Sequence, residues 1–335
     1  MENAFHPLSI KNLTIASNII QAPLASYSSR SYRHLCALHS SPLATTEMVS
    51  VEGLLREGEK TLSLLKLADT EKAQNLYEND KARIPLSVQL FGSEASSFEK
   101  AANVLLKQYV PYIIDVNSAC PVKKVTKTGS GAALMGSPKK LGEIVKVLNE
   151  TTEGRVAITV KLRLGKDENH MNYLKCAEEC FKNGASLVAM HARTEKALYS
   201  GKADHCHTKL LKATFPEFLI IASGDIYSRH DAENIIECTN ADGVLAARGA
   251  IGNPFIFDEN EDKYTDSDYI NAFLKHLELE TYYDDVPLKE LRKFAPYYLK
   301  HLKHSSNVKE ARVDICTTAT VKEDYEALLK TITIL

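Results

Sequence analysis

The chain has 335 residues, enough for one large barrel domain and a small appended domain. Its content of 44% hydrophobic and 25% charged residues is usual for a globular protein with a packed core. Its formal net charge of -2 excludes a global positive field that would attract nucleic acid, so any contact with RNA must come from local basic patches.

The cysteines and the N-terminal segment set the expected compartment. The seven cysteines are scattered and odd in number, which argues against a disulfide framework and for a reducing environment. The first ten residues carry no apolar leader, and no segment is long enough to span a bilayer. We therefore expect a cytoplasmic protein that makes no membrane contact.

Short apolar runs alternate with longer amphipathic stretches from residue 19 to residue 246. Eight strand-like runs separated by helical patterns predict a parallel α/β architecture, and eight such units over roughly 250 residues fit a TIM (β/α)8 barrel. A doubly wound sheet is the alternative, but the G-x-G of Gly129 and Gly131 does not open the first helix of a βαβ unit. The eight runs are residues 19–24, 43–49, 85–91, 112–116, 156–162, 187–190, 218–222 and 243–246. The stretches that we expect to form helices include residues 97–106, 138–148, 173–183 and 228–237.

The segment 113–136 carries the most distinctive pattern of the chain. A short apolar run ends at Val116 and is followed by Asn117, Cys120, a basic pair and a glycine-punctuated loop. A thiol after a strand, on a loop with glycine hinges and flanking lysines, is a candidate reactive group. For this loop alone, a buried cysteine in an ordinary strand-to-helix turn is an equally good interpretation.

Polar side chains gather at the ends of the predicted strands, the face that carries the chemistry in TIM barrels. The loops after the seventh and eighth strands commonly hold a phosphate there. Gly224 and Gly249 allow close backbone approach, and Arg248 supplies a bidentate donor. The pattern alone therefore predicts a barrel that binds a phosphorylated ligand. The residues at the ends of the third to eighth runs are Gln89, Asn117, Cys120, Lys161, Arg163, His191, Arg193, Ser223, Gly224, Asp225, Arg248 and Gly249.

The composition changes after Phe257. We interpret the acidic stretch 258–268 as a linker or a solvated face, and helical patterns follow at residues 269–283, 287–304 and 321–334. The sequence thus predicts a barrel domain of residues 1–257 and a small helical domain of residues 258–335. Basic and aromatic residues interleave in the second of these helical patterns, which suits phosphates and unstacked bases. On sequence alone, a solvated helix face with an aromatic core stripe is the favoured interpretation of that pattern.

Taken together, these motifs resemble the tRNA-dihydrouridine synthase family, in particular its bacterial B- and C-type members. The family pattern N-x-x-C-P-x-x-K-V, followed by a Gly/Ala-rich loop, is matched from Asn117 onward. The chain departs from the family at Ser223, where Asn is usual, at Ala247, where Gly is usual, and in the first-strand loop 24–29. Further matches, in order and spacing, lie at residues 21–25, 46–49, 88–92, 160–163, 191–194, 224–226 and 248–254.

The resemblance implies an FMN-dependent enzyme that reduces a uridine of tRNA to 5,6-dihydrouridine, with NADPH or NADH as the reductant. It implies that Cys120 protonates C5 while reduced flavin gives a hydride to C6, and that Asn117, Arg163 and Tyr199 bind the uracil. It also implies that the helical domain binds tRNA, and a monomer is expected. The residues implied to bind FMN are Pro23, Leu24, Ala25, Gln89, Lys161, His191, Ser223, Gly224, Asp225, Ala247 and Arg248.

Two other functions fit parts of the sequence. A flavin-dependent barrel reductase of a small molecule would need neither Cys120 nor the basic and aromatic tail. A catalytically silent barrel that only binds RNA would need neither Cys120 nor Lys161. Cys176 and Cys180, together with the run 205–207, offer soft ligands, but their spacing fits no standard zinc pattern, so no metal is predicted.

Overall fold

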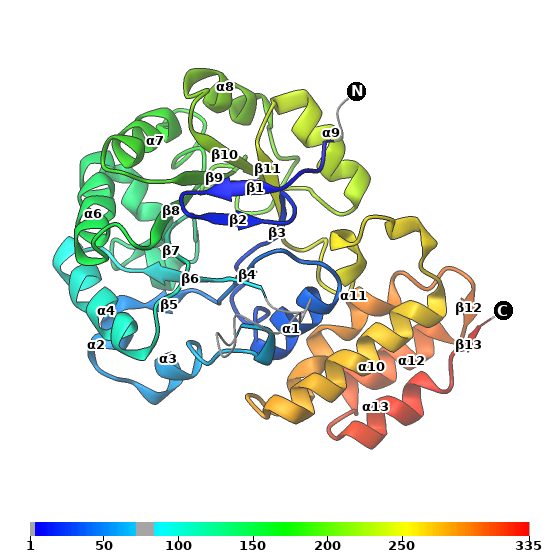
Figure 1. Ribbon diagram of the computed structural model, residues 1–335. Coiled ribbons are helices and arrows are strands. Elements are labelled where there is room, and N and C mark those ends of the chain that lie inside the picture. The colour runs from blue at the N-terminus through cyan, green and yellow to red at the C-terminus, as the bar shows by residue number, and fades with distance from the viewer. Residues whose placement is uncertain (1–3, 72–83, 335) are drawn as a thin grey trace.

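Figure 1 shows the computed structural model, which describes residues 4–71 and 84–334, as a ring of parallel strands surrounded by helices with a helical bundle at its side. Around the barrel the strand order is β3-β11-β10-β9-β8-β7-β6-β4, and β5 also pairs with β6. Every one of these strand pairs is parallel, which confirms the predicted TIM (β/α)8 barrel followed by helices. The strands are β3 (Ile19–Gln21), β4 (Ala44–Thr45), β5 (Val49–Ser50), β6 (Leu86–Phe91), β7 (Ile113–Ser118), β8 (Ala157–Leu162), β9 (Leu187–His191), β10 (Leu219–Ser223) and β11 (Gly243–Ala246).

The helices of the barrel follow its strands and cover them with apolar faces. In α6, Pro138 occupies the first turn, where its missing N–H costs nothing, and Leu141, Ile144, Val145 and Leu148 face the core at helical spacing. The helices are α1 (Arg30–Leu38), α2 (Val51–Leu55), α3 (Glu59–Ser63), α4 (Ala95–Gln108), α5 (Lys123–Thr126), α6 (Pro138–Thr151), α7 (Tyr173–Lys182), α8 (Cys206–Thr214) and α9 (Arg229–Thr239). Short 3-10 turns are η1 (Asp69–Glu71), η2 (Gly131–Gly136), η3 (Pro254–Phe257) and η4 (Glu261–Lys263).

The predicted strand 43–49 was wrong as a single element, because β4 and β5 pair with β6 separately. Between them the hydroxyl of Thr46 accepts the backbone N–H of Gln89 at 3.1 Å, in place of a ladder bond. In the described part of the chain, no strand ladder joins β3 to β4. The side chain of Gln21 bridges this seam, since its Oε1 accepts the backbone N–H of Thr45 at 2.9 Å.

An N-terminal hairpin closes the bottom of the barrel. Its strands are β1 (Leu8–Ile10) and β2 (Leu13–Ile15), which pair antiparallel. Leu8, Ile10 and Ile15 are buried in one cluster with the residues that begin β7, β8 and β9. Because the hairpin covers the N-terminal ends of these strands, the C-terminal ends are the side from which we expect a ligand to enter.

The C-terminal bundle shares its hydrophobic core with the barrel. In Figure 1 its long helix α10 (Asp266–Tyr283) lies beside α1, and one cluster of buried side chains joins Tyr32 of α1 and Val244 of β11 to Phe273 of α10. The boundary predicted after residue 257 stays a prediction, and the packing does not break there. The remaining elements are η5 (Leu288–Lys293), α11 (Ala295–Leu299), β12 (Ser305–Ser306), α12 (Val308–Thr317), α13 (Lys322–Leu329) and β13 (Thr333–Ile334).

The acidic stretch 258–268, interpreted from the sequence as a linker or a solvated face, is exposed along much of its length but contains two buried carboxylates. Asp258 is 9% exposed and accepts bonds from the hydroxyls of Ser40 and Tyr264. Asp266 is 6% exposed and accepts the backbone N–H groups of residues 303 and 304. The two carboxylates thus tie the bundle to the barrel and to itself.

Among the described helices, none has both the length and the apolar character that crossing a membrane requires.

Candidate active site

A cavity of ≈ 400 Å³ opens at the C-terminal ends of the strands. Its wall contains every residue that the sequence predicted to bind a cofactor or substrate or to act in catalysis, so the structure brings the whole predicted set together. The wall also contains residues to which the sequence assigned no part in the site, among them Tyr27, Met48 and Tyr227, and it contains Tyr297 of the basic and aromatic pattern. Tyr297 belongs to α11, so the C-terminal bundle contributes a side chain to this cavity.

Cys120 is held at the cavity by a tight turn after β7. The side-chain Oδ1 of Asn117 accepts the backbone N–H groups of Ala119 at 3.1 Å and Cys120 at 2.9 Å, a bond pattern that fixes the turn. Gly131 packs on this turn with a φ of 61°, and a Cβ there would lie 2.7 Å from the carbonyl oxygen of Cys120. The glycine-rich loop therefore serves close approach to the backbone that carries the thiol.

The thiol of Cys120 is kept neutral by its surroundings. Burial raises the pKa of Cys120, and the opposing influences of the Val122 amide, Arg163 and Lys161 are too small to offset it. A raised pKa keeps the proton on sulfur throughout the neutral range. A half-buried neutral thiol is a proton donor and a poor nucleophile at that pH.

A chain of buried amides connects this turn to the barrel interior. The Nδ2 of Asn117 donates to Oε1 of Gln89 at 2.8 Å, and Nε2 of Gln89 donates to Oδ2 of Asp115 at 2.7 Å. The hydroxyl of Thr159 donates to the other oxygen of Asp115. Each polar group is satisfied by the next, so the amides of Gln89 and Asn117 have fixed orientations. The oxygen of Asn117 holds the turn, and its Nδ2 also lies 3.7 Å from Sδ of Met48, so a ligand can gain an N–H from Asn117 only by replacing this weak sulfur contact.

Lys161 on β8 lies beside Asn117 in strand register and reaches the same cavity. Burial, followed by the nearby Arg163, lowers the pKa of Lys161 to about 8, and Asp115 only partly opposes this. Among residues 4–71 and 84–334, no hydrogen bond or ion pair satisfies its ammonium group. An ammonium held without a partner in a cavity is well placed to bind an electron-rich or anionic ligand atom.

Arg163 is 1% exposed and joins two loops of the site. Its Nε donates to the carbonyl oxygen of Ala119 at 2.8 Å, and its Nη1 donates to the carbonyl oxygens of Thr194 and Leu198, each at 2.8 Å. These bonds link the Cys120 turn to the loop that carries Tyr199, whose ring lies 5.5 Å from the guanidinium carbon. Only Nη2 of Arg163 is left to meet a ligand.

Two arginines and one aspartate lie at the ends of β9, β10 and β11. Arg193 donates Nη2 to both carboxylate oxygens of Asp225 at 2.7 Å, and Arg248 approaches Asp225 at 3.6 Å. Burial works to raise the pKa of Asp225, but the bonds from Arg193 and from the Ala203 amide outweigh it, so the pKa lies below its usual value. A carboxylate that is ionised and bound to arginine would repel a phosphate. Asp225 therefore orients the arginines here, while Arg248, with its side chain 36% exposed, is the group that can meet an anion.

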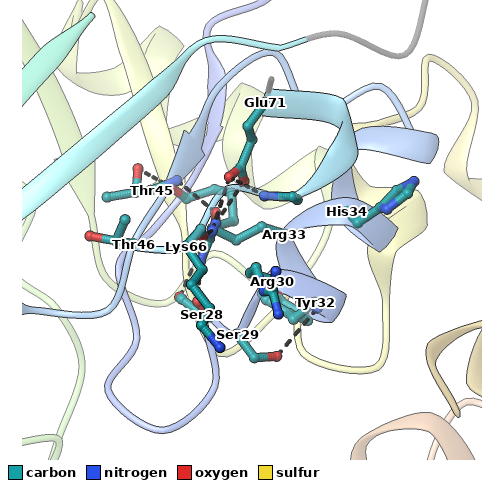
Figure 2. Close-up of polar contacts among 12 residues, drawn as sticks. Ser28, Ser29, Arg30, Tyr32, Arg33, His34, Thr45, Thr46, Lys66 and Glu71 are labelled. Atoms are coloured by element: carbon teal, nitrogen blue, oxygen red, sulfur yellow. Dashed lines mark hydrogen bonds and ion pairs between the residues drawn. The ribbon is translucent and has the colours of Figure 1, made fainter. Parts of the chain in front are cut away.

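Behind the first-strand loop lies the buried ion pair of Arg33 and Glu71, which Figure 2 shows with its polar neighbours. Arg33 of α1 donates Nε to Glu71 at 2.7 Å and Nη2 to the same carboxylate at 2.9 Å, and both side chains are at most 2% exposed. Nη1 of Arg33 donates to the carbonyl oxygen of Ser28, whose hydroxyl accepts the backbone N–H of Leu24. The ion pair thus fixes the loop that presents Leu24 to the cavity.

The cavity mouth combines the first-strand loop with the bundle. The rings of Tyr27 and Tyr297 meet edge to face with centroids 6.1 Å apart. Lys293 lies 5.5 Å from the ring of Tyr27, and Lys300 lies 5.5 Å from the ring of Tyr297. The predicted aromatic stripe is divided: Tyr298 is fully buried in the core, whereas Tyr297 lines the cavity.

Cys176, Cys180 and the run 205–207, which the sequence offered as soft metal ligands, are buried or hydrogen-bonded to other groups of the protein. Cys176 and Cys180 are buried in α7, and His207 bonds to the hydroxyl of Tyr173 at 2.9 Å. His205 bonds through Nε2 to the carbonyl oxygen of Gly224 at 2.9 Å. Across residues 4–71 and 84–334, no group of three or more His, Cys, Asp or Glu side chains is arranged to hold a metal ion.

The sequence of this chain is similar to those of known proteins. The profile of a family described as dihydrouridine synthase matches residues 20–333. A probable tRNA-dihydrouridine synthase from Treponema pallidum is 33% identical over 271 residues, which cover 79% of this chain and 76% of that protein. One from Aquifex aeolicus is 36% identical over 251 residues, 73% of each protein. The tRNA-dihydrouridine synthase B of Vibrio cholerae is 31% identical over 285 residues, 85% of this chain and 80% of that protein.

Solved structures share the fold at low identity. Histamine dehydrogenase from Rhizobium sp. 4-9 aligns with a TM-score of 0.55 and 13% identity, over 83% of this chain and 51% of that one. The 6-hydroxypseudooxynicotine amine oxidase from Pseudomonas geniculata N1 aligns with a TM-score of 0.52 and 13% identity, over 75% of this chain and 48% of that one. This chain spans about half the length of these two proteins, and the likeness concerns the barrel fold alone.

Proposed function

This chain belongs to the dihydrouridine synthase family, and on that premise we propose that it reduces a uridine of tRNA to 5,6-dihydrouridine, with bound FMN as the hydride donor. The observation that carries the proposal is that one cavity holds the neutral thiol of Cys120 and an ammonium, that of Lys161, with no partner among the described residues. Reduction of a C=C bond needs a proton donor beside a hydride source, and no side chain donates hydride.

The residues of the cavity suit a flavin mononucleotide. The free ammonium of Lys161 matches the electron-rich edge of the flavin ring, and the segment 23–25 with Gln89 offers it an apolar and amide-lined wall. His191 faces the same space. Arg248, with the backbone around Ser223, Gly224 and Ala247, would hold the phosphate. Asp225 acts in this scheme through the two arginines that it binds.

The side chains divide the work of the reaction as follows. The bound flavin supplies the hydride that C6 of the uracil receives. Cys120 gives its proton to C5, and the thiolate takes a proton back from water. Asn117 fixes the turn that carries the thiol and can donate its amide N–H to the uracil. Nη2 of Arg163 can reach a uracil oxygen, and Tyr199, held over two arginines, flanks the base.

The substrate is a nucleotide in a folded RNA, so its base must leave the stack to enter the cavity. We propose that the helical segment 258–335 binds the tRNA and that Tyr297 with Lys293 and Lys300 meets it at the mouth of the cavity.

NADPH, or NADH, is the proposed reductant of the flavin. Because tRNA is the substrate, we assign the protein to the cytoplasm, and we propose that it acts as a monomer.

Stopped-flow spectroscopy tests this function directly. The purified protein is loaded with FMN and reduced with NADPH in the absence of oxygen. It is then mixed with an unmodified tRNA transcript or, in a parallel run, with cyclohexenone. We expect the flavin absorbance to return with tRNA much faster than with the enone. Reoxidation by the enone alone would identify a small-molecule reductase, and a protein that binds tRNA but no flavin would be an RNA-binding barrel.

A further inference from the structure

Arg193, at the end of β9, uses all three nitrogens of its guanidinium group within the protein. Nε donates to the carbonyl oxygen of Ser200 at 3.2 Å, and Nη2 donates to that of Gly201 and to Asp225, each at 2.7 Å. The remaining nitrogen, Nη1, lies 3.2 Å from Nε2 of His191. Arg193 is 3% exposed, so water does not compete strongly for these bonds.

This last contact determines where the proton of His191 lies. An arginine can only donate, so Nε2 of His191 must accept, and a neutral imidazole then carries its proton on Nδ1. A charged imidazolium would place two donors face to face. Burial, followed by the positive groups of Lys161, Arg163, Arg193 and Arg248, lowers the pKa of His191 far below its usual value, in agreement with this geometry.

The ring of His191 is also oriented. Gly224 lies against its Nε2 edge with a φ of 117°, and a Cβ there would come within 3.0 Å of the ring carbon Cδ2. With Arg193 and Gly224 on that edge, the Nδ1 edge is the one that a ligand in the cavity can meet. No hydrogen bond to Nδ1 occurs among the described residues.

We propose that Arg193 is a positioning residue, which holds His191 as the neutral tautomer protonated on Nδ1 and so makes it a fixed N–H donor to the ligand. The same guanidinium anchors residues 200 and 201 and, through Asp225, the backbone N–H of Ala203. It therefore also sets the loop that carries Tyr199. The tautomer of His191 does not depend on the proposed function. The identification of the acceptor as a flavin atom rests on that function.

Nitrogen-15 NMR of the flavin-free parent protein tests the tautomer directly. Histidine labelled with ¹⁵N reports which ring nitrogen bears the proton, and the signals that disappear in His191→Asn identify the residue among the eleven histidines. We expect Nδ1 of His191 to be protonated and Nε2 to be bare at neutral pH. A proton on Nε2, or on both nitrogens, would overturn the proposal. In Arg193→Met we expect the signal to move toward the other tautomer, whereas an unmoved signal would show that Arg193 does not set it.

A matched pair of variants tests the donor in the flavin complex. The amide nitrogen of asparagine falls near the position of Nδ1, and that of glutamine falls near Nε2. His191→Asn should therefore keep an N–H donor toward the cavity, and His191→Gln should lose it. We expect flavin affinity to fall by about 3- to 10-fold more in the Gln variant, the usual effect of one hydrogen bond. Equal affinities would overturn the donor role. If Nδ1 of His191 is protonated but the protein does not reduce tRNA, the proposed function is wrong and the inference about the tautomer stands.

Discussion

Replacement of Lys161 by methionine should make the flavin-free protein more stable and the flavin complex weaker. The pKa of Lys161 lies at about 8, against an ordinary value of 10.5, because burial and Arg163 disfavour its charge. At 1.36 kcal/mol per pKa unit, this difference is at most on the order of 3 kcal/mol of unfavourable free energy at neutral pH. Methionine fills a similar volume without a charge, so the free energy of unfolding should rise by up to that amount.

The sign of the pH dependence follows from the two pKa values. Below pH 8 both the folded and the unfolded chain carry the proton, so the full penalty is present. Between pH 8 and 10.5 the folded protein loses the proton first and the penalty shrinks. The gap in stability between Lys161→Met and the parent should therefore narrow as the pH rises through this window.

Urea unfolding of the flavin-free proteins at pH 7 and at pH 9.5 measures this gap. Lys209→Met, which changes an exposed lysine, is the control and should alter stability by no more than about 0.5 kcal/mol. Flavin affinity should fall by about 10- to 100-fold in Lys161→Met, the effect expected for one charge-assisted hydrogen bond. A variant that is less stable than the parent at pH 7, with a gap that does not change with pH, would refute the reasoning.

Three further predictions, two of them with a control variant, test other parts of the structure. Cys120→Ala should bind flavin and accept electrons from NADPH normally, but stopped-flow reoxidation by tRNA should slow by about 10²- to 10⁴-fold, and normal reoxidation would remove the thiol from the proton-donor role. Gly252→Ala should lower both the melting temperature and the affinity for tRNA, because its Cβ would lie 2.3 Å from a backbone carbon of α11. Gly201→Ala is the control, because Gly201 has a similar φ and its Cβ would lie in open space. Calorimetry should show a smaller loss of stability for this control, about 1 kcal/mol. Equal losses of stability in the two variants would mean that the clash at Gly252 is irrelevant. Arg33→Met should cost about 3–5 kcal/mol in urea unfolding because it leaves the carboxylate of Glu71 buried and alone, and the loss should shrink in the double variant with Glu71→Leu.

The sequence predicted the barrel and the place of its site because both follow from local patterns. Apolar runs that end in polar residues mark parallel strands, and in a parallel barrel those ends meet on one face. For this reason Gln89, Asn117, Lys161 and His191 could be placed together from spacing alone. The family resemblance then gave each of them an expected role.

What the sequence did not predict depends on partners that are distant along the chain. The carboxylate of Asp225 lies against Arg193, a contact between the ends of two strands that no local pattern encodes. Within the acidic stretch, the burial of Asp258 and Asp266 involves partners at Ser40 and at residues 303–305, which are distant along the chain. The helix α12 was missed, since residues 308–317 carry only a weak apolar stripe. Tyr297 was noted for its composition, but its place in the cavity depends on the docking of α11 over Gly252.

Mass spectrometry of tRNA tests the central claim most directly. An unmodified tRNA transcript is incubated with the FMN-loaded protein and NADPH, digested with a nuclease, and compared with the same reaction of Cys120→Ala. We predict that one fragment gains the mass of two hydrogen atoms with the parent protein and that this product forms far more slowly with the variant. If the parent, loaded with reduced flavin, leaves every uridine of the transcripts unchanged, or if the variant forms the product at the same rate, the account is contradicted.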